Sequence, residues 1–271
     1  MKANDIILYS DMDGTALTDW SLGPVVPEEN LRLIRRFVDE GGSFSVASGR
    51  QAGIILRYFP GVSFSAPLVC GNGAVVYDAR SGRFLRRILV PQSYKRESLE
   101  YMLSRPEVWI VAANERGIWQ VLTGDPVRDA GLKIVRHPGI TAGQFLEQDF
   151  VKVVYVSEEA QSMERVRAET EALPSAGLVC ALQSGPQFLE VMERSVNKAS
   201  GVACARAAAG MEGRTLVCIG DYFNDLAMLR AADIAACPRT SPREIRDICQ
   251  IVTCGNNEGA VGDLIRQLKL W

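Results

Sequence analysis

The chain has 271 residues, of which 47% are hydrophobic and 23% charged, a balance typical of a globular domain and not of a disordered segment. Its 30 basic and 32 acidic side chains give a formal charge of -2, which excludes the basic surplus that nucleic acid or an anionic membrane requires. The length favours two modest domains, and the charge balance favours a small-molecule partner.

The seven cysteines are odd in number, scattered and never spaced as CxxC, which argues against a disulfide framework and against a zinc site. The apolar run before Asp11 is too short for the core of a signal peptide, and no apolar run of about 18 residues follows. We therefore expect a cytoplasmic protein.

The first part of the chain predicts a βαβ unit. Residues 6–9 (IILY) and 44–47 (FSVA) are short apolar runs typical of buried strands. Between them, Pro27 is placed to open a helix that Gly41 and Gly42 would end. Parallel strands need such a crossover, and ligands of parallel sheets bind at the carboxyl ends of the strands.

Two more apolar runs, 68–70 (LVC) and 215–219 (TLVCI), predict further strands. Polar residues follow three of the predicted strands: Asp11 the first, Ser48 the second, and Asp221 the run at 215–219. Because these strands are expected to be parallel, we expect the three clusters to converge at one edge of the sheet.

The middle of the chain predicts a different architecture. Its predicted elements are an amphipathic stretch at 92–104, a hairpin at 108–122, a strand at 150–156, a helix at 157–173, and strands near 178–183 and 187–192. Hairpins that alternate with helices indicate an α+β module. We expect this module to occupy residues 84–188, inserted into an α/β domain formed by residues 1–83 and 189–271.

Asp11 and Asp13 lie one residue apart at the end of the first predicted strand. Two such carboxylates can have different roles, because one can bind a metal and act as a nucleophile while the other transfers a proton. Carboxylate ligands favour magnesium, which usually also takes phosphate oxygens of the substrate. The pair therefore indicates a phosphate ester as the substrate. Gly14 would allow backbone N–H groups to approach the phosphate closely. A lone Asp-x-Asp could instead be a surface turn.

Four motifs resemble those of the haloacid dehalogenase (HAD) superfamily of aspartate-nucleophile phosphatases, in the same order along the chain. They are DMDGT at 11–15, ASGR at 47–50, Lys198 in SVNKASG, and GDYFND at 220–225. Together with NGA at 72–74 and NNEGAV at 256–261, they are similar to the Cof-type branch. The resemblance implies a Rossmann-like parallel-sheet core (HAD fold) with an inserted α+β cap domain of the C2B type.

The resemblance also implies a reaction. Asp11 would accept the phosphoryl group, and Asp13 would protonate the leaving oxygen and then activate water. Magnesium would be held by Asp11, the backbone carbonyl of Asp13, and Asp221, with Asn224 or Asp225 in support.

A second set of residues is expected to bind the phosphate. The resemblance assigns this contact to Lys198 and Ser48, and Gly14, Gly49 and Asn224 are further candidates. Three of them have ordinary structural alternatives: Lys198 as a solvated lysine near a helix start, Ser48 as a turn hydroxyl, and Asn224 as a helix cap, an alternative that Asp225 shares.

Three other residues carry weaker signals. Asn72 and Gly73 form a good hairpin turn by themselves, so a ligand role for Asn72 is only an alternative. Tyr222 stands where the family more often has a small residue, and we expect it to affect substrate selection. His137, the sole histidine, lies beside a Pro-Gly pair and is expected in a loop without a catalytic role.

These observations predict a magnesium-dependent phosphatase that hydrolyses small phosphorylated metabolites, and the family resemblance implies sugar phosphates as the substrate class. One alternative is a phosphomutase or phosphotransferase acting on sugar phosphates. Another is a non-catalytic sensor that binds a phosphometabolite. We expect no nucleic-acid or membrane partner, and the sequence makes no prediction of the oligomeric state.

Overall fold

A computed structural model describes residues 2–270, with the backbone alone for Ala160. The chain forms two compact units. The first consists of the chain up to Arg86 and from Asn197 onward, and the second of Arg87–Val196. The second unit continues past the expected boundary at residue 188, because strand β11 (Phe188–Glu193) pairs with strand β9 (Lys152–Val156) of the same unit. A cap function for this unit stays a prediction.

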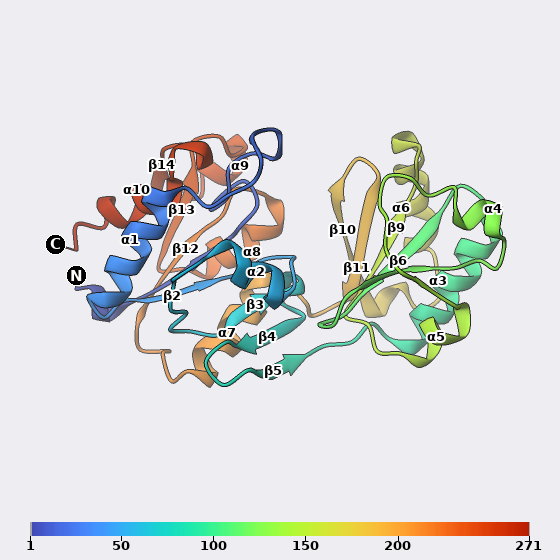
Figure 1. The fold of residues 1–271 in the computed structure, drawn as a ribbon, viewed down its shortest axis with the longest axis horizontal. Helices are drawn as coiled ribbons and strands as arrows, with labels where there is room; N and C mark the ends of the chain where they lie inside the picture. The colour runs from blue at the N-terminus through green and yellow to red at the C-terminus, as the bar shows by residue number, and fades with distance from the viewer. Residues whose placement is uncertain (1, 271) are drawn as a thin grey trace. The chain divides into compact units, whose positions relative to one another are not determined.

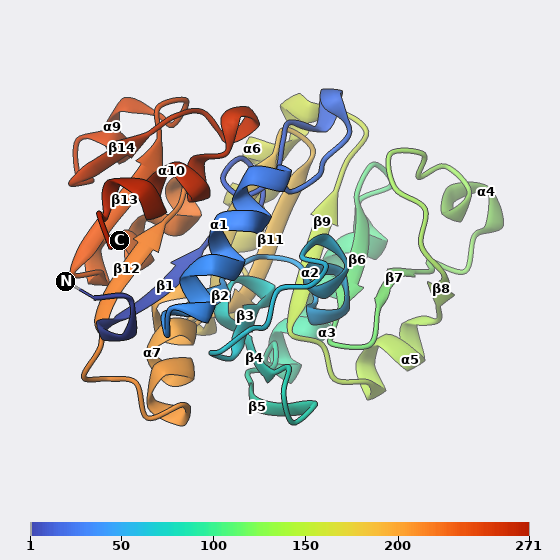
Figure 2. The same cartoon turned by 60° about the vertical axis from the view of Figure 1, so that its left-hand side comes forward.

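The first unit contains a sheet of five parallel strands in the order β14-β13-β12-β1-β2 (Figure 1 and Figure 2). The strands are β1 (Ile6–Ser10), β2 (Ser43–Val46), β12 (Thr215–Ile219), β13 (Ile234–Pro238) and β14 (Ile251–Thr253). All five residues of β1 are buried, as expected for a strand with a neighbour on each side and helices on its faces. The predicted α/β class with a parallel sheet is confirmed.

Helices follow the strands in the expected crossover pattern. The helix between β1 and β2 is α1 (Glu28–Asp39), with Pro27 as its N-cap residue, and it lies beside α10 (Ala260–Gln267) (Figure 1). Helices α7 (Lys198–Ala208) and α8 (Leu226–Ala231) bury apolar side chains against Ile7 and Tyr9 of β1. These alternate residues of β1 face the same side of the sheet.

A smaller sheet also begins in the first unit, with the strand order β3-β4-β5. Its strands are β3 (Leu68–Cys70), β4 (Val75–Asp78) and β5 (Arg83–Arg87). The predicted strand at 68–70 is therefore present, but it pairs antiparallel with β4. It meets the segment after β2 through one parallel bridge between Ala47 and Val69.

The second unit has a six-stranded sheet, and Figure 2 shows its strands β9, β6, β7 and β8 following one another. The remaining strands and helices of this unit are β6 (Trp109–Ala113), β7 (Ile118–Val121), β8 (Gly139–Ile140), β10 (Val179–Gly185), α3 (Gln92–Ser104), α4 (Pro126–Asp129), α5 (Ala142–Glu147) and α6 (Met163–Glu171). The expected helix at 157–173 begins only at Met163, because the Ser157 hydroxyl accepts a hydrogen bond from the Glu159 N–H and stabilises a turn instead.

Two expectations from composition can be compared with the structure. All seven cysteines are free, and three of them, Cys70, Cys218 and Cys237, are buried while the others are half-buried. Within residues 2–270, no helix combines the length and the apolar character that crossing a membrane would require.

Candidate active site

The carboxyl ends of β1 and β12 bring three acidic side chains together. The Asp11 N–H donates to the carbonyl of Ile219, at 2.8 Å, so the chain after β1 stays beside the chain after β12. Carboxylate oxygens of Asp11, Asp221 and Asp225 lie within 4.8 Å of one another. The convergence expected from the strand ends is seen here for β1 and β12.

Lys198 lies in the first turn of α7 and points into this group of carboxylates. Its side chain is 0% exposed, and its Nζ donates to Oδ1 of Asp11 and, at 2.6 Å, to Oδ1 of Asp225. Asn197 caps the helix, because its side chain accepts from the Ser200 N–H at 2.9 Å. Lys198 is therefore not a solvated lysine at a helix start, the alternative that its sequence position left open.

Two glycines allow α7 to approach closely enough to place Lys198. A Cβ at Gly73, which has a φ of +106°, would lie 2.1 Å from the Asn197 carbonyl oxygen. A Cβ at Gly201 would lie 2.4 Å from a methyl group of Val69 and 2.9 Å from Cα of Gly73. The NGA and KASG motifs thus form one close backbone contact, for which only glycine is small enough.

Two further glycines make room for the carboxylates. Gly14 has a φ of +75°, and a Cβ there would lie 2.4 Å from Oδ2 of Asp221, whose Oδ1 accepts from the Thr15 hydroxyl at 3.1 Å. A Cβ at Gly220 would lie 2.4 Å from Cγ of Asp225. The sequence predicts that Gly14 lets backbone N–H groups approach a phosphate. Its observed neighbour is Asp221, and the phosphate contact stays a prediction.

Asp225 has a larger part in the cluster than the sequence suggested. It is fully buried in the short helix η6 (Phe223–Asp225), and its Oδ2 accepts from the N–H groups of Asp221 and Tyr222 at 3.1 and 3.3 Å. Its Oδ1 binds Lys198. Asp225 therefore shapes the turn after β12 and also places a carboxylate beside Asp11.

Asp13, in contrast, directs its carboxylate to Arg50. Arg50 Nε donates to Oδ2 of Asp13 at 2.8 Å, and Nη2 donates to Oδ1 at 2.6 Å. Binding of magnesium by the backbone carbonyl of Asp13 stays a prediction. Arg50 is part of the ASGR motif, but no role for it is predicted from the sequence. Its position directly after the second strand, at the edge that carries Asp11, was the available signal.

The other candidates for phosphate binding lie near these groups. Ser48 is buried, and its hydroxyl accepts from the Arg50 N–H at 3.2 Å, as a turn residue would. A Cβ at Gly49 would lie 3.1 Å from Oδ1 of Asn72, and Asn224 is half-buried in η6. Contacts of these residues with a phosphate group stay predictions.

The electrostatics of the cluster indicate an excess of negative charge. Burial and the neighbouring Asp225 raise the pKa of Asp11 well above its usual range, although Lys198 opposes this. Burial and Asp225 likewise raise the pKa of Asp221 to about 6. Burial alone would lower the pKa of Lys198, but Asp11 and Asp225 outweigh it and raise that pKa. One ammonium group therefore faces three carboxylates, and these hard oxygen donors suit a magnesium ion.

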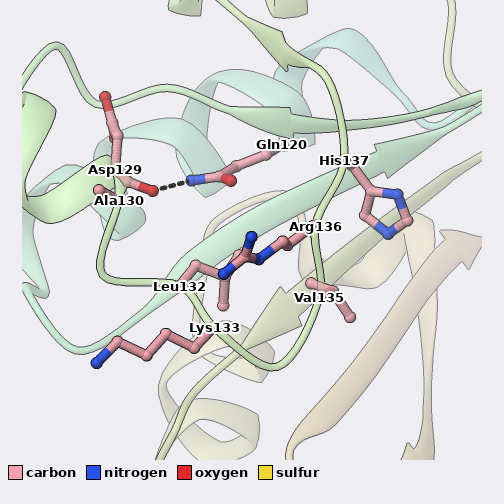
Figure 3. A pocket seen from close by; sticks show the side chains of 8 residues that line it. All are labelled: Gln120, Asp129, Ala130, Leu132, Lys133, Val135, Arg136 and His137. Atoms are coloured by element: carbon pink, nitrogen blue, oxygen red, sulfur yellow. Dashed lines mark hydrogen bonds between the residues drawn. The ribbon is translucent and has the colours of Figure 1, made fainter.

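A pocket of about 460 Å³ lies in the second unit (Figure 3). Its lining residues are Gln120, Asp129, Ala130, Leu132, Lys133, Val135, Arg136 and His137. His137 is in the loop before β8, as expected, and burial lowers its pKa. The Lys133 amine and the His137 ring point away from each other in Figure 3, so they do not converge on one point of the pocket.

Comparisons with known proteins agree with this arrangement. Residues 8–265 match the haloacid dehalogenase-like hydrolase family. The 5-amino-6-(5-phospho-D-ribitylamino)uracil phosphatase YcsE of Bacillus subtilis is 22% identical over 97% of this chain and 96% of its own length. The solved structure of the phosphatase BT1666 from Bacteroides thetaiotaomicron has a TM-score of 0.79 at 21% identity, and the match covers 98% of this chain and 95% of that chain. The subclass IIB sugar phosphatase BT4131 has a TM-score of 0.78 at 15% identity, with 98% and 99% covered.

The chain belongs to the haloacid dehalogenase-like hydrolases. Within this family it is an enzyme of the phosphatase class and of the Cof type, as the four motifs together with NGA and NNEGAV predicted.

Proposed function

We propose that this phosphatase is magnesium-dependent, hydrolyses small phosphorylated metabolites, and uses Asp11 as its nucleophile. The buried contact of Lys198 with both Asp11 and Asp225 is the observation that supports this most. An ammonium group in contact with Asp11 favours its anionic form, and the anion is the form that attacks phosphorus. In the proposed reaction the same ammonium group also compensates negative charge on the phosphoryl oxygens.

The proposed reaction has two steps. In the first step an oxygen of Asp11 bonds to phosphorus, the bond between phosphorus and the ester oxygen breaks, and Asp13 gives its proton to the leaving oxygen. In the second step water bonds to phosphorus, Asp13 takes a proton from that water, and the bond between phosphorus and Asp11 breaks. Inorganic phosphate leaves, and both carboxyl groups return to their initial state.

Asp11, Asp221 and Asp225 are the side chains that would hold the magnesium ion. The backbone carbonyl of Asp13 is the further ligand that the family resemblance implies. Three oxygen donors with an uncompensated negative charge fit a hard divalent cation. When bound, the ion supplies positive charge to the phosphoryl oxygens and favours the ionised form of Asp11.

Sugar phosphates are the proposed substrate class, and the cytoplasm is the proposed location. One relative is named a 5-amino-6-(5-phospho-D-ribitylamino)uracil phosphatase and one structural neighbour a sugar phosphatase, which supports this class. The free state of all seven cysteines suits a reducing compartment.

The test is release of inorganic phosphate from a panel of sugar phosphates, nucleotides, pyridoxal phosphate, 5-amino-6-(5-phospho-D-ribitylamino)uracil and p-nitrophenyl phosphate, with and without magnesium. We expect magnesium-dependent release that Asp11→Asn abolishes. The matched control is Asp39→Asn, on the exposed end of α1. Formation of an isomeric phosphate ester with little free phosphate would contradict hydrolysis and favour a mutase. Unchanged release by Asp11→Asn would contradict the assignment of the nucleophile.

A further inference from the structure

We propose that Arg50 is a positioning residue for the reaction, and that it holds the Asp13 carboxylate in the orientation required for proton exchange with the leaving group and with water. The inference rests on the proposed function, in which Asp13 is the acid and base. It concerns the first unit alone, because all of the side chains involved belong to that unit.

The two acids of the DMDGT motif have separate cationic partners. Asp11 is bound by the Lys198 ammonium group, whereas both oxygens of Asp13 are bound by the Arg50 guanidinium group. Asp13 remains 42% exposed in this pair, while the Asp11 side chain is almost fully buried. The carboxylate of Asp13 therefore binds Arg50, outside the three-carboxylate cluster, and remains accessible to solvent.

The guanidinium group is itself held in place by two aromatic rings. Its Cζ lies 5.0 Å from the ring centre of Trp20 and 5.3 Å from that of Tyr58. Trp20 belongs to the short helix η2 (Trp20–Leu22) after β1, and Tyr58 ends helix α2 (Ala52–Tyr58). Stacking on aromatic faces fixes the plane of a guanidinium group, and a fixed plane fixes the direction of its two parallel hydrogen bonds.

The backbone of Arg50 is anchored independently of its side chain. The Arg50 N–H donates to the Ser48 hydroxyl at 3.2 Å, and its carbonyl accepts from the Gly71 N–H at 3.2 Å. The side chain thus starts from a fixed point and ends on a fixed carboxylate. A substitution of Arg50 removes the side-chain contacts but not these backbone bonds, so we expect the turn to survive it.

A bidentate pair leaves part of the carboxylate unused. Each carboxylate oxygen has about two acceptor positions, and Arg50 occupies one on each oxygen of Asp13. The remaining positions have a defined direction as long as the guanidinium group is present. Small errors in the placement of a proton donor cost large factors in rate, so a fixed direction has a kinetic value.

The decisive variants are Arg50→Lys and Arg50→Gln, with Arg57→Lys as the matched control. Lysine keeps the positive charge but loses the planar fork, and Arg57 is an exposed arginine on the neighbouring helix α2. Trp20→Leu tests the stacking contribution while keeping Arg50. Urea unfolding of each variant establishes that it folds.

We expect the Arg50 variants to separate the two steps. The nitrophenolate leaving group needs no proton, so the initial burst with p-nitrophenyl phosphate should keep its rate within about threefold of wild type. Steady-state turnover, which needs Asp13 to activate water, should fall by about 10- to 100-fold, and turnover of a sugar phosphate should fall at least as much. Trp20→Leu should have a smaller loss in the same direction, and Arg57→Lys should match wild type.

Two results would overturn the inference while leaving the proposed function intact. One is Arg50→Lys turnover within about threefold of an active wild type. The other is a KM increase of about tenfold with kcat unchanged, which would make Arg50 a ligand of the substrate. If instead wild type releases no phosphate, or Asp11→Asn behaves like wild type, the proposed function fails and this inference fails with it.

Discussion

Lys198 Nζ lies 2.6 Å from Oδ1 of Asp225, and both side chains are 0% exposed. A buried ammonium group is costly unless carboxylates compensate its charge, and here Asp11 supplies a second one. The pair therefore ties the start of α7 to the turn after β12 and to the end of β1. Removing the amine would affect folding and chemistry together.

Lys198→Met tests this double role. We expect phosphate release to be lost, and the free energy of unfolding to fall by about 3–5 kcal/mol, because two buried carboxylates lose their cation. Urea unfolding measures the change in stability. The control is Lys133→Met, an exposed lysine whose loss should change stability by no more than about 0.5 kcal/mol. Equal stability of both variants would contradict the role assigned to the buried pair.

Local patterns in the sequence predicted three strands of the five-stranded sheet, β1, β2 and β12, and the acids at its edge, but they did not predict β13 and β14. The apolar run at 6–9 predicted β1, and the position of Asp11 directly after it predicted its place at the carboxyl edge of the sheet. The partner of Asp13 could not be predicted in this way. Arg50 reaches Asp13 across 37 positions of the chain, and no local pattern encodes which acid a distant arginine will bind.

The glycines illustrate the same difference. That Gly14 adopts a positive φ could be expected from a turn after a strand, but its contact with Asp221 depends on how β1 and β12 are placed in space. Gly73 and Gly201 lie far apart in the sequence, and their mutual contact appears only in the folded chain. Sequence motifs thus identified the residue types, and tertiary packing decided what each residue touches.

Gly14→Ala should separate backbone strain from displacement of a carboxylate. A Cβ at Gly14 would lie 2.4 Å from Oδ2 of Asp221, so we expect Asp221 to move and phosphate release to fall at least about tenfold. The matched control is Gly23→Ala, since Gly23 has a similar φ of +77° with no atom within 4 Å of the added Cβ. Both variants should lose about 1 kcal/mol of stability through strain. Equal activity of the two would contradict the proposed importance of the contact.

Tyr222→Ser tests the expectation that this residue affects substrate selection. Tyr222 is 49% exposed, and its ring packs against that of Phe223 at 5.0 Å between centres, next to the turn that carries Asp225. We expect the ranking of substrates by kcat/KM to change by about threefold or more, while magnesium dependence is retained. Val252→Ser, an exposed apolar position on β14, serves as the control. An unchanged ranking would exclude a role of Tyr222 in selection.

The pKa of Asp221 predicts how stability depends on pH in the metal-free protein. Burial and Asp225 raise this pKa from 3.8 to about 6, so between these values the folded state binds more protons than the unfolded state. The contribution of Asp221 to the free energy of unfolding therefore falls as pH rises from about 4 to about 6, by roughly 1–3 kcal/mol, and is constant above that range. Urea unfolding in the presence of a chelator measures this contribution, as the difference in free energy of unfolding between wild type and Asp221→Asn at each pH. A difference that is independent of pH would contradict the raised pKa.

If Asp11, Asp221 and Asp225 bind magnesium, the ion should restore the free energy of unfolding that is lost as pH rises. Above the Kd, each tenfold increase in magnesium should add about 1.4 kcal/mol to the free energy of unfolding at a pH near 7.5. The gain should fade as pH falls through about 6, because a proton on Asp221 competes with the ion. Asp225→Asn should reduce the gain, since it removes one of the three ligands, whereas Asp247→Asn, in the segment after helix α9 (Arg243–Arg246), should keep it. Equal gains in wild type and Asp225→Asn would place the ion elsewhere in the protein.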